Sequence, residues 1–177
     1  AGGTSPDFDG DGRADIFVGD PSDNSNQGAV FRFYGGRTVG DVFGSWSLHP
    51  TPYGARFGGL LASLGDVNGD GFADLAASSL GLESSPSSGR TYVFLGGPSF
   101  VAPNPATVLT ATGAVAVASA GDANGDGFAD LVAVDSGATR LHLGSAGGIA
   151  PAPSVTLPTG GNSVSAGDLN GDGFADL

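Results

Sequence analysis

Short apolar runs separated by glycine-rich polar turns recur along the whole chain. Three of these runs, residues 28–36, 89–97 and 137–145, are aligned with one another and close on a glycine or a Gly-Ser pair. Aromatic and β-branched residues are frequent in such runs when they form strands. The runs at Ile16 to Val18 and Leu131 to Val134 lack the 3.6-residue spacing of a helix. The pattern predicts an all-β chain of short strands.

The strands are organised around one acidic decapeptide that occurs four times, at residues 7–16, 66–75, 122–131 and 168–177. Between consecutive copies stand four strand candidates, which we name A to D, so that the acidic loop always joins A to B. Four-stranded units repeated at this length are typical of β-propeller blades. The sequence therefore predicts one partial propeller over residues 1–177. Its approximate repeat units are 1–54, 55–110, 111–158 and 159–177, the last being the start of a fourth.

The number of predicted strands is too small for a closed ring. The chain reads as strands B-C-D, two complete A-B-C-D units and a final strand A with its loop, which amounts to three blades. Propellers typically have four to eight blades. We therefore expect an incomplete ring of antiparallel blades, closed by another copy of the chain or by the rest of a longer parent. The fourth acidic loop duplicates the first, and this redundancy favours a fragment of a longer parent.

Composition excludes several classes of protein. Six Arg, no Lys and 18 acidic residues give a formal net charge of −12, the wrong sign for a nucleic-acid binder. No apolar run approaches the roughly 18 residues of a membrane span. Cysteine is absent, which removes disulfides and thiolate chemistry.

Most of the acidic residues lie in the four decapeptides, where they follow the pattern D-x-[DN]-x-D-G-x-x-D. Clustered carboxylates repel one another, and a divalent cation is the usual reason that a fold tolerates them. Oxygen ligands at positions 1, 3 and 5, a glycine at 6 and a carbonyl at 7 match the first half of an EF-hand loop, but the next acid stands at position 9 instead of 12. An all-oxygen set favours Ca²⁺. Plain Asp/Gly-rich turns are the alternative.

The sequence thus predicts up to four Ca²⁺ sites, with side-chain ligands at positions 1, 3, 5 and 9 and a backbone carbonyl at position 7. The carbonyl ligands are those of Arg13, Phe72, Phe128 and Phe174. The predicted side-chain ligands are Asp7, Asp9, Asp11, Asp15, Asp66, Asn68, Asp70, Asp74, Asp122, Asn124, Asp126, Asp130, Asp168, Asn170, Asp172 and Asp176.

These features resemble the FG-GAP repeats of the integrin α-subunit propeller and its bacterial relatives. Phe57-Gly58, Leu61-Ala62 and the loop from Asp66 to Asp74 carry the resemblance, which covers nearly the whole chain. The resemblance implies a calcium-braced propeller used for extracellular recognition, sometimes attached to an enzyme domain. We accordingly expect a secreted or cell-surface protein.

The function predicted from these observations is a non-enzymatic, calcium-stabilised module for recognition of an extracellular protein or ligand. Strand parity places the B–C and D–A connections on the edge opposite the acidic loops, and loops on a rigid scaffold often carry binding function. The candidate surface is Asp20 to Gln27, Pro50 to Arg56 and Leu80 to Ser88, with His49 and Tyr53. Plain polar turns are the simpler interpretation of these segments.

Two other functions remain as alternatives, and two more are disfavoured. A carbohydrate-binding, lectin-like propeller would use Trp46, Tyr53 and Tyr92 to stack on sugars, and an accessory domain of a larger secreted enzyme is a further alternative. A dockerin-like module is disfavoured because position 12 carries no acid. Catalysis is disfavoured because the two histidines are His49 and His142, and His142 aligns with Phe33 and Phe94 in a strand.

Overall fold

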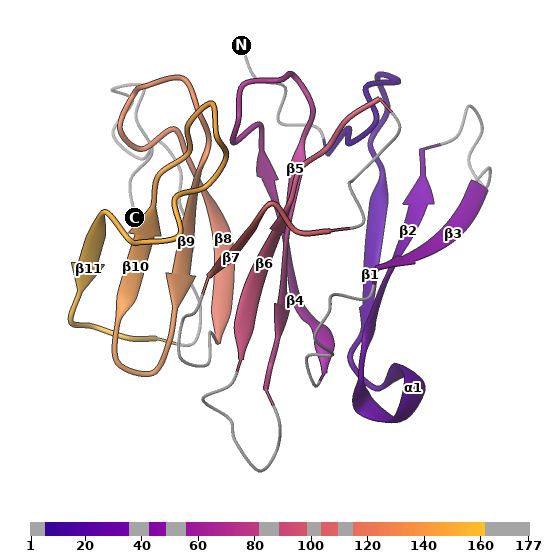
Figure 1. Cartoon of the computed structure of the whole chain (residues 1–177), viewed down its shortest axis with the longest axis horizontal. Coiled ribbons are helices and arrows are strands. Elements are labelled where there is room, and N and C mark those ends of the chain that lie inside the picture. Colours follow the sequence, from indigo (N-terminus) through magenta and orange to yellow (C-terminus); the bar gives the residue numbers. More distant parts are fainter. Residues whose placement is uncertain are drawn as a thin grey trace.

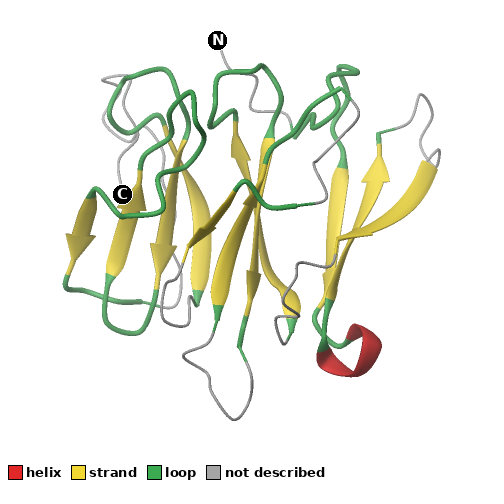
Figure 2. Ribbon diagram, in the orientation of Figure 1, coloured by secondary structure: helices red, strands yellow, loops and turns green. Residues whose placement is uncertain are grey.

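The computed structural model describes residues 6–35, 43–48, 56–81, 89–98, 104–109 and 115–161. These residues form three antiparallel sheets that stand side by side with their faces together (Figures 1 and 2). The described residues also include one short helical turn, α1 (Asp23–Asn26). No described helix is long and apolar enough to cross a membrane.

Each sheet follows the order of its strands along the chain. The first sheet contains β1 (Ile16–Asp20), β2 (Ala29–Tyr34) and β3 (Phe43–Leu48). The second contains β4 (Phe57–Gly65), β5 (Asp74–Ser79), β6 (Arg90–Phe94) and β7 (Thr107–Leu109). The third contains β8 (Ala116–Gly121), β9 (Asp130–Val134), β10 (Thr139–His142) and β11 (Val155–Leu157).

The second and third sheets are the predicted four-stranded blades, and the first sheet holds the predicted strands B, C and D. The prediction of antiparallel propeller blades in an open array is therefore confirmed for the described residues. The acidic loops join β4 to β5 and β8 to β9, which are strands A and B of their blades. The predicted final strand A and the fourth acidic decapeptide fall in residues 162–177, which lie outside the described residues.

Most residues of β5, in the middle sheet, are small because the strand lies between two other sheets. It is buried along its whole length, because alternate side chains pack against the two neighbouring sheets. Leu75 and Ala77 belong to the hydrophobic cluster shared with the first sheet, and Ala76 belongs to the cluster shared with the third. The hydroxyls of Ser78 and Thr91 pair across the strands at 2.8 Å, so these buried polar groups are satisfied.

Aromatic side chains fill the first of these clusters. Phe57 packs edge to face against Tyr92 and Phe94, with ring centroids 5.6 and 6.3 Å apart. Tyr92 is 2% exposed, so the structure removes it from the predicted sugar-stacking surface. His49 and Tyr53 lie outside the described residues, and so does the side chain of Trp46.

The alignment of His142 with two phenylalanines is confirmed by strand register. Phe33 pairs with Ile16, Phe94 with Leu75 and His142 with Leu131, and each of these partners directly follows the last Asp of its acidic loop. His142 is buried, its Nδ1 donates to the carbonyl of Ala150 at 3.0 Å, and burial lowers its pKa. This histidine occupies an aromatic position in the packing between the second and third sheets.

Candidate metal sites

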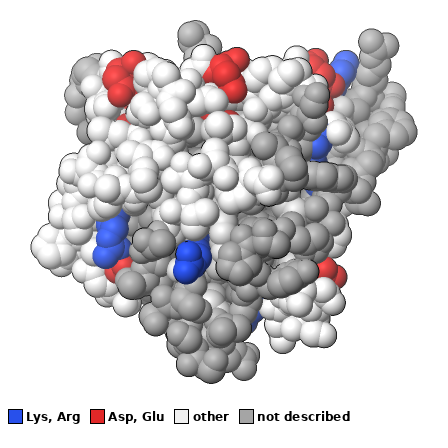
Figure 3. All heavy atoms as spheres, viewed as in Figure 1, with Lys and Arg blue, Asp and Glu red and all other residues white. Residues whose placement is uncertain are grey.

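The three described acidic loops, 7–15, 66–74 and 122–130, lie along one edge of the molecule, opposite α1 (Figure 1). Acidic side chains gather along the same edge in the space-filling view (Figure 3). The predicted separation of the acidic loops from the B–C connections is therefore present in the described residues. We number each loop from its first Asp, as position 1, to its last Asp, as position 9.

Position 1 organises each loop through backbone hydrogen bonds. The glycine at position 6 donates to the position-1 carboxylate at 2.8 to 2.9 Å in all three loops. This glycine has a φ between +83° and +93°, a conformation that side-chain-bearing residues rarely adopt, which explains why the position is glycine. The donor and acceptor pairs are Gly12 with Asp7, Gly71 with Asp66, and Gly127 with Asp122.

Position 9 holds a buried carboxylate that ties its loop to a distant strand. One of its oxygens accepts the N–H at position 2, and the other accepts the N–H of a glycine that follows strand C. In the second loop these bonds join Asp74 to Val67 at 2.7 Å and to Gly96 at 2.8 Å. The same pairs are Asp15 with Phe8 and Gly35, and Asp130 with Ala123 and Gly144. The sequence predicted position 9 only as a ligand, and this structural role was missed.

Burial also changes the protonation of these carboxylates. The pKa of Asp74 is raised to about 7, mainly by burial and in smaller part by the charges of Asp70 and Asp66, against the opposing effect of its two backbone hydrogen bonds. Burial raises the pKa of Asp15 and Asp130 as well. A cation beside these groups would favour their charged form.

Position 5 is exposed in all three described loops, and its N–H donates to the side chain at position 3 in each of them. Asn68 Oδ1 accepts the N–H of Asp70 at 3.1 Å, and Asn68 Nδ2 donates to Asp70 Oδ2 at 2.9 Å. Asn124 and Asp126 repeat both contacts. In the first loop, Asp11 N–H donates to Asp9 Oδ1 at 3.1 Å, and an ion pair between Arg13 and Asp11 at 2.9 Å takes the place of the side-chain amide bond.

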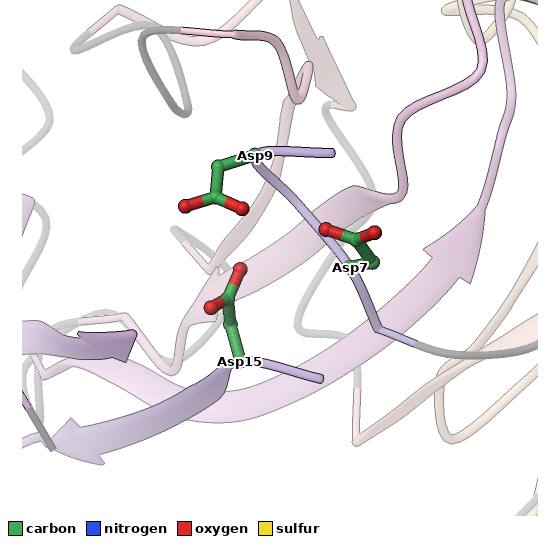
Figure 4. A group of neighbouring side chains, drawn as sticks. All are labelled: Asp7, Asp9 and Asp15. Atoms are coloured by element: carbon green, nitrogen blue, oxygen red, sulfur yellow. The ribbon is translucent and has the colours of Figure 1, made fainter. Parts of the chain in front are cut away.

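The first loop brings three carboxylates together. Oxygens of Asp7, Asp9 and Asp15 all lie within 4.8 Å of one another, and Figure 4 shows the three groups facing a common point. Because Ca²⁺ binds oxygens at roughly 2.3 to 2.6 Å, ligands on opposite sides of one ion are about 5 Å apart. The spacing and the all-oxygen donor set fit a single Ca²⁺. Asp11 is not part of this trio.

Asx-type turns account for the bonds at positions 1, 3 and 5 without any ion. They do not account for the buried acid at position 9. Keeping this carboxylate charged costs free energy, because it is buried and lies beside other carboxylates, and its raised pKa reflects that cost. This feature repeats in all three described loops. The fourth set of predicted ligands, Asp168, Asn170, Asp172, Phe174 and Asp176, lies outside the described residues.

The largest described part of the candidate recognition surface is the B–C connection around α1. Asn24, Ser25 and Asn26 all have positive φ, between 47° and 66°, so α1 is a left-handed turn. Asp20 fixes its start by accepting from the N–H and hydroxyl of Ser22, which lower the pKa of Asp20. Residues 49–55 and 82–88 of the predicted surface lie outside the described residues.

One buried charge was not anticipated from sequence. Arg32 is buried between the first and second sheets, with its guanidinium carbon 3.6 Å from the ring centre of Tyr34. Burial lowers the pKa of Arg32 to about 10. In the sequence, Arg32 is a charged residue within the apolar run 28–36. A charged residue there is equally typical of a strand position that faces water, so the pattern did not indicate burial.

Comparison with known families gives three overlapping matches to a family described as an FG-GAP-like repeat, at residues 7–77, 66–133 and 122–177. Each matched segment begins at position 1 of one acidic loop and ends beyond the next loop. The acidic loop is therefore the feature at which the repeats join. No curated protein matches the sequence.

Proposed function

This chain belongs to the FG-GAP-like repeat family, and on that basis we propose that it is a calcium-binding, calcium-stabilised propeller module for extracellular recognition and is not an enzyme. The observation that carries the proposal is the convergence of Asp7, Asp9 and Asp15 in a loop whose plan recurs at each described repeat. The binding partner is proposed to be a protein or glycan outside the cell.

In each loop, side-chain oxygens at positions 1, 3, 5 and 9 and the carbonyl at position 7 would hold the ion. The cation would supply the positive charge that the clustered carboxylates lack. Four bound Ca²⁺ would change the formal net charge from −12 to about −4. The backbone bonds at positions 1 and 9 already aim the carboxylates, so calcium would complete the loops and join them more firmly to their strands.

The opposite edge is proposed as the recognition surface. Consecutive left-handed residues cost free energy and are found where function or packing requires them. The turn is also anchored, because Arg56 N–H donates to the Asn26 carbonyl at 2.7 Å and Phe57 N–H donates to the Gln27 carbonyl at 3.0 Å. A rigid, polar turn of this kind suits a binding loop. A glycan ligand or an attached enzyme domain remains an alternative prediction.

The metal proposal is tested by removing one exposed ligand at a time. Asp70→Ala and Asp126→Ala are each expected to abolish calcium binding at their own loop. Each variant loses one ligand of the ion, and the neighbouring carboxylates of that loop are left without a neutralising charge. Asp23→Ala, in α1 and outside every acidic loop, is the matched control and is expected to bind as the wild type does. Calorimetric titration measures the number of sites, and equal binding by all three variants would refute the ligand assignment.

One face of the first sheet is proposed to pack against another blade. Ile16 and Val18 are 56% and 47% exposed, and they lie opposite Phe33 and Phe31. In the second sheet the equivalent residues of β5, Leu75 and Ala77, are buried against the first sheet. The exposed face thus has the composition of a blade interface, and a second copy or the rest of a longer parent would cover it.

A charge on this face is therefore expected to weaken association. Val18→Asp should raise the dissociation constant of a self-associated form by at least about tenfold, because the charge would be buried without a partner. Ser25→Asp is the control, since it adds the same charge at an exposed position of α1, away from the faces of the sheets. Native light scattering should give about twice 17.2 kDa for the wild type, and a monodisperse wild-type chain of 17.2 kDa would contradict self-association.

A further inference from the structure

Consecutive acidic loops are joined by backbone hydrogen bonds. Ala73 N–H donates to the carbonyl of Asp7 at 3.0 Å, and Ala129 N–H donates to the carbonyl of Asp66 at 2.9 Å. In both cases position 8 of one loop holds position 1 of the preceding loop. A second bond reaches position 2 of the preceding loop, from Gly97 to Phe8 at 3.0 Å and from Ser145 to Val67 at 3.1 Å.

A phenylalanine ring reinforces each junction. A Cβ atom at Gly10 would lie 2.6 Å from Cε1 of Phe72, so the ring rests directly on this glycine. Phe128 covers Gly69 in the same way, at 2.8 Å. Both glycines stand at position 4 of the preceding loop, and their N–H groups donate to its position-1 Asp at 2.6 to 2.7 Å. The ring therefore packs on the peptide that aims a predicted calcium ligand.

The same phenylalanine is also part of its own loop. Phe72 N–H donates to Asp70 Oδ1 at 3.0 Å, and its carbonyl is the predicted position-7 ligand. In the first loop this position is Arg13, which pairs with Asp11 of the same loop. The junctions present in the described residues therefore connect the first loop with the second and the second with the third.

We propose that calcium binding at consecutive loops is coupled, with Phe72 and Phe128 as the positioning residues that transmit the coupling. A cation in one loop fixes the phenylalanine through its backbone, and the ring orders the position-1 Asp of the preceding loop. Because coupling between sites is reciprocal, each of the two loops at a junction strengthens binding at the other. This inference rests on the proposed calcium binding.

The test follows each loop separately by NMR during a titration with Ca²⁺. The amides of Gly12, Gly71 and Gly127 each donate to the position-1 Asp of one loop and so report its occupancy. Phe72→Ala keeps the backbone carbonyl and every side-chain ligand. It is expected to raise the midpoints for Gly12 and Gly71 at least about fivefold and to leave Gly127 within about twofold. Phe128→Ala, the matched control, should affect Gly71 and Gly127 and spare Gly12.

A second variant keeps the test decisive if Phe72→Ala does not fold. Asp70→Ala changes an exposed side chain, removes a ligand from the second loop and leaves the Phe72 ring in place. The coupling predicts that Asp70→Ala also raises the Gly12 midpoint about fivefold. If the wild type titrates but neither variant moves the Gly12 midpoint, the coupling is wrong and calcium binding stands. If no glycine amide of the wild type responds to calcium, both the coupling and the proposed function are wrong.

Discussion

Removal of Ca²⁺ is expected to lower the free energy of unfolding by about 1 to 4 kcal/mol for the three described loops together. Extracellular calcium modules commonly have dissociation constants of about 10⁻⁴ to 10⁻³ M. At about 1 mM Ca²⁺, mass action then stabilises the folded state by roughly 0.4 to 1.4 kcal/mol per loop. Denaturant unfolding in Ca²⁺ and in chelator measures the difference.

Magnesium at the same concentration is the control for this prediction. Mg²⁺ demands octahedral geometry and gives up its waters reluctantly, so it should stabilise the chain much less than Ca²⁺. If chelator leaves the unfolding transition unchanged, calcium does not stabilise this fold and the prediction is wrong.

The calcium effect is expected to depend on pH in a definite direction. The pKa of Asp74 is about 7 in the folded state, above its ordinary value of 3.8, so the folded chain binds more protons than the unfolded chain between those values. In chelator, stability should therefore fall as pH rises from about 4 to 7. Calcium binds the deprotonated carboxylate, so the stabilisation by calcium should grow over the same range. Paired unfolding curves at pH 5 and pH 8 measure both trends.

Asp74→Ala is expected to cost about 2 to 3 kcal/mol of folding stability at pH 8 even in chelator. The substitution leaves the N–H groups of Val67 and Gly96 without the acceptors that they have at 2.7 and 2.8 Å. Buried donors left unsatisfied cost about 1 to 3 kcal/mol each, and relief of the buried charge offsets part of that. Denaturant unfolding of the variant in chelator checks this value.

Asp70→Ala serves as the control for Asp74→Ala, because Asp70 belongs to the same loop but is exposed. In chelator it should unfold at nearly the wild-type denaturant concentration, and in Ca²⁺ it should lose the stabilisation supplied by one loop. If Asp74→Ala were destabilised only when Ca²⁺ is present, position 9 would be a ligand with no structural role.

Internal repetition made much of this fold predictable. Because the decapeptide fixes where strand A ends and strand B begins, β5 and β9 start at Asp74 and Asp130, at the position-9 acid. The same alignment predicted that His142 takes a phenylalanine position, and its pairing with Leu131 confirms it. Because the same strand occurs in several aligned repeats, each copy gives an independent indication of where that strand begins and which residues it pairs with.

The contacts that join the repeats were not predictable in the same way. Gly96 reaches Asp74 across 22 residues, and Phe72 reaches Gly10 from the next blade. A single sequence records that glycine or phenylalanine recurs at a position, but it does not record which distant group meets it. Burial of Arg32 is a further example, because a strand position between two sheets and one facing water have the same local pattern.

Equilibrium dialysis, with the bound metal counted by atomic emission, measures whether each acidic loop holds one Ca²⁺. With about 10 mM Ca²⁺, well above the affinity range of such modules, the account predicts at least three ions per chain, one for each described loop. Asp70→Ala should hold about one ion fewer than the wild type under the same conditions. A wild-type chain that retains less than one ion would contradict the account.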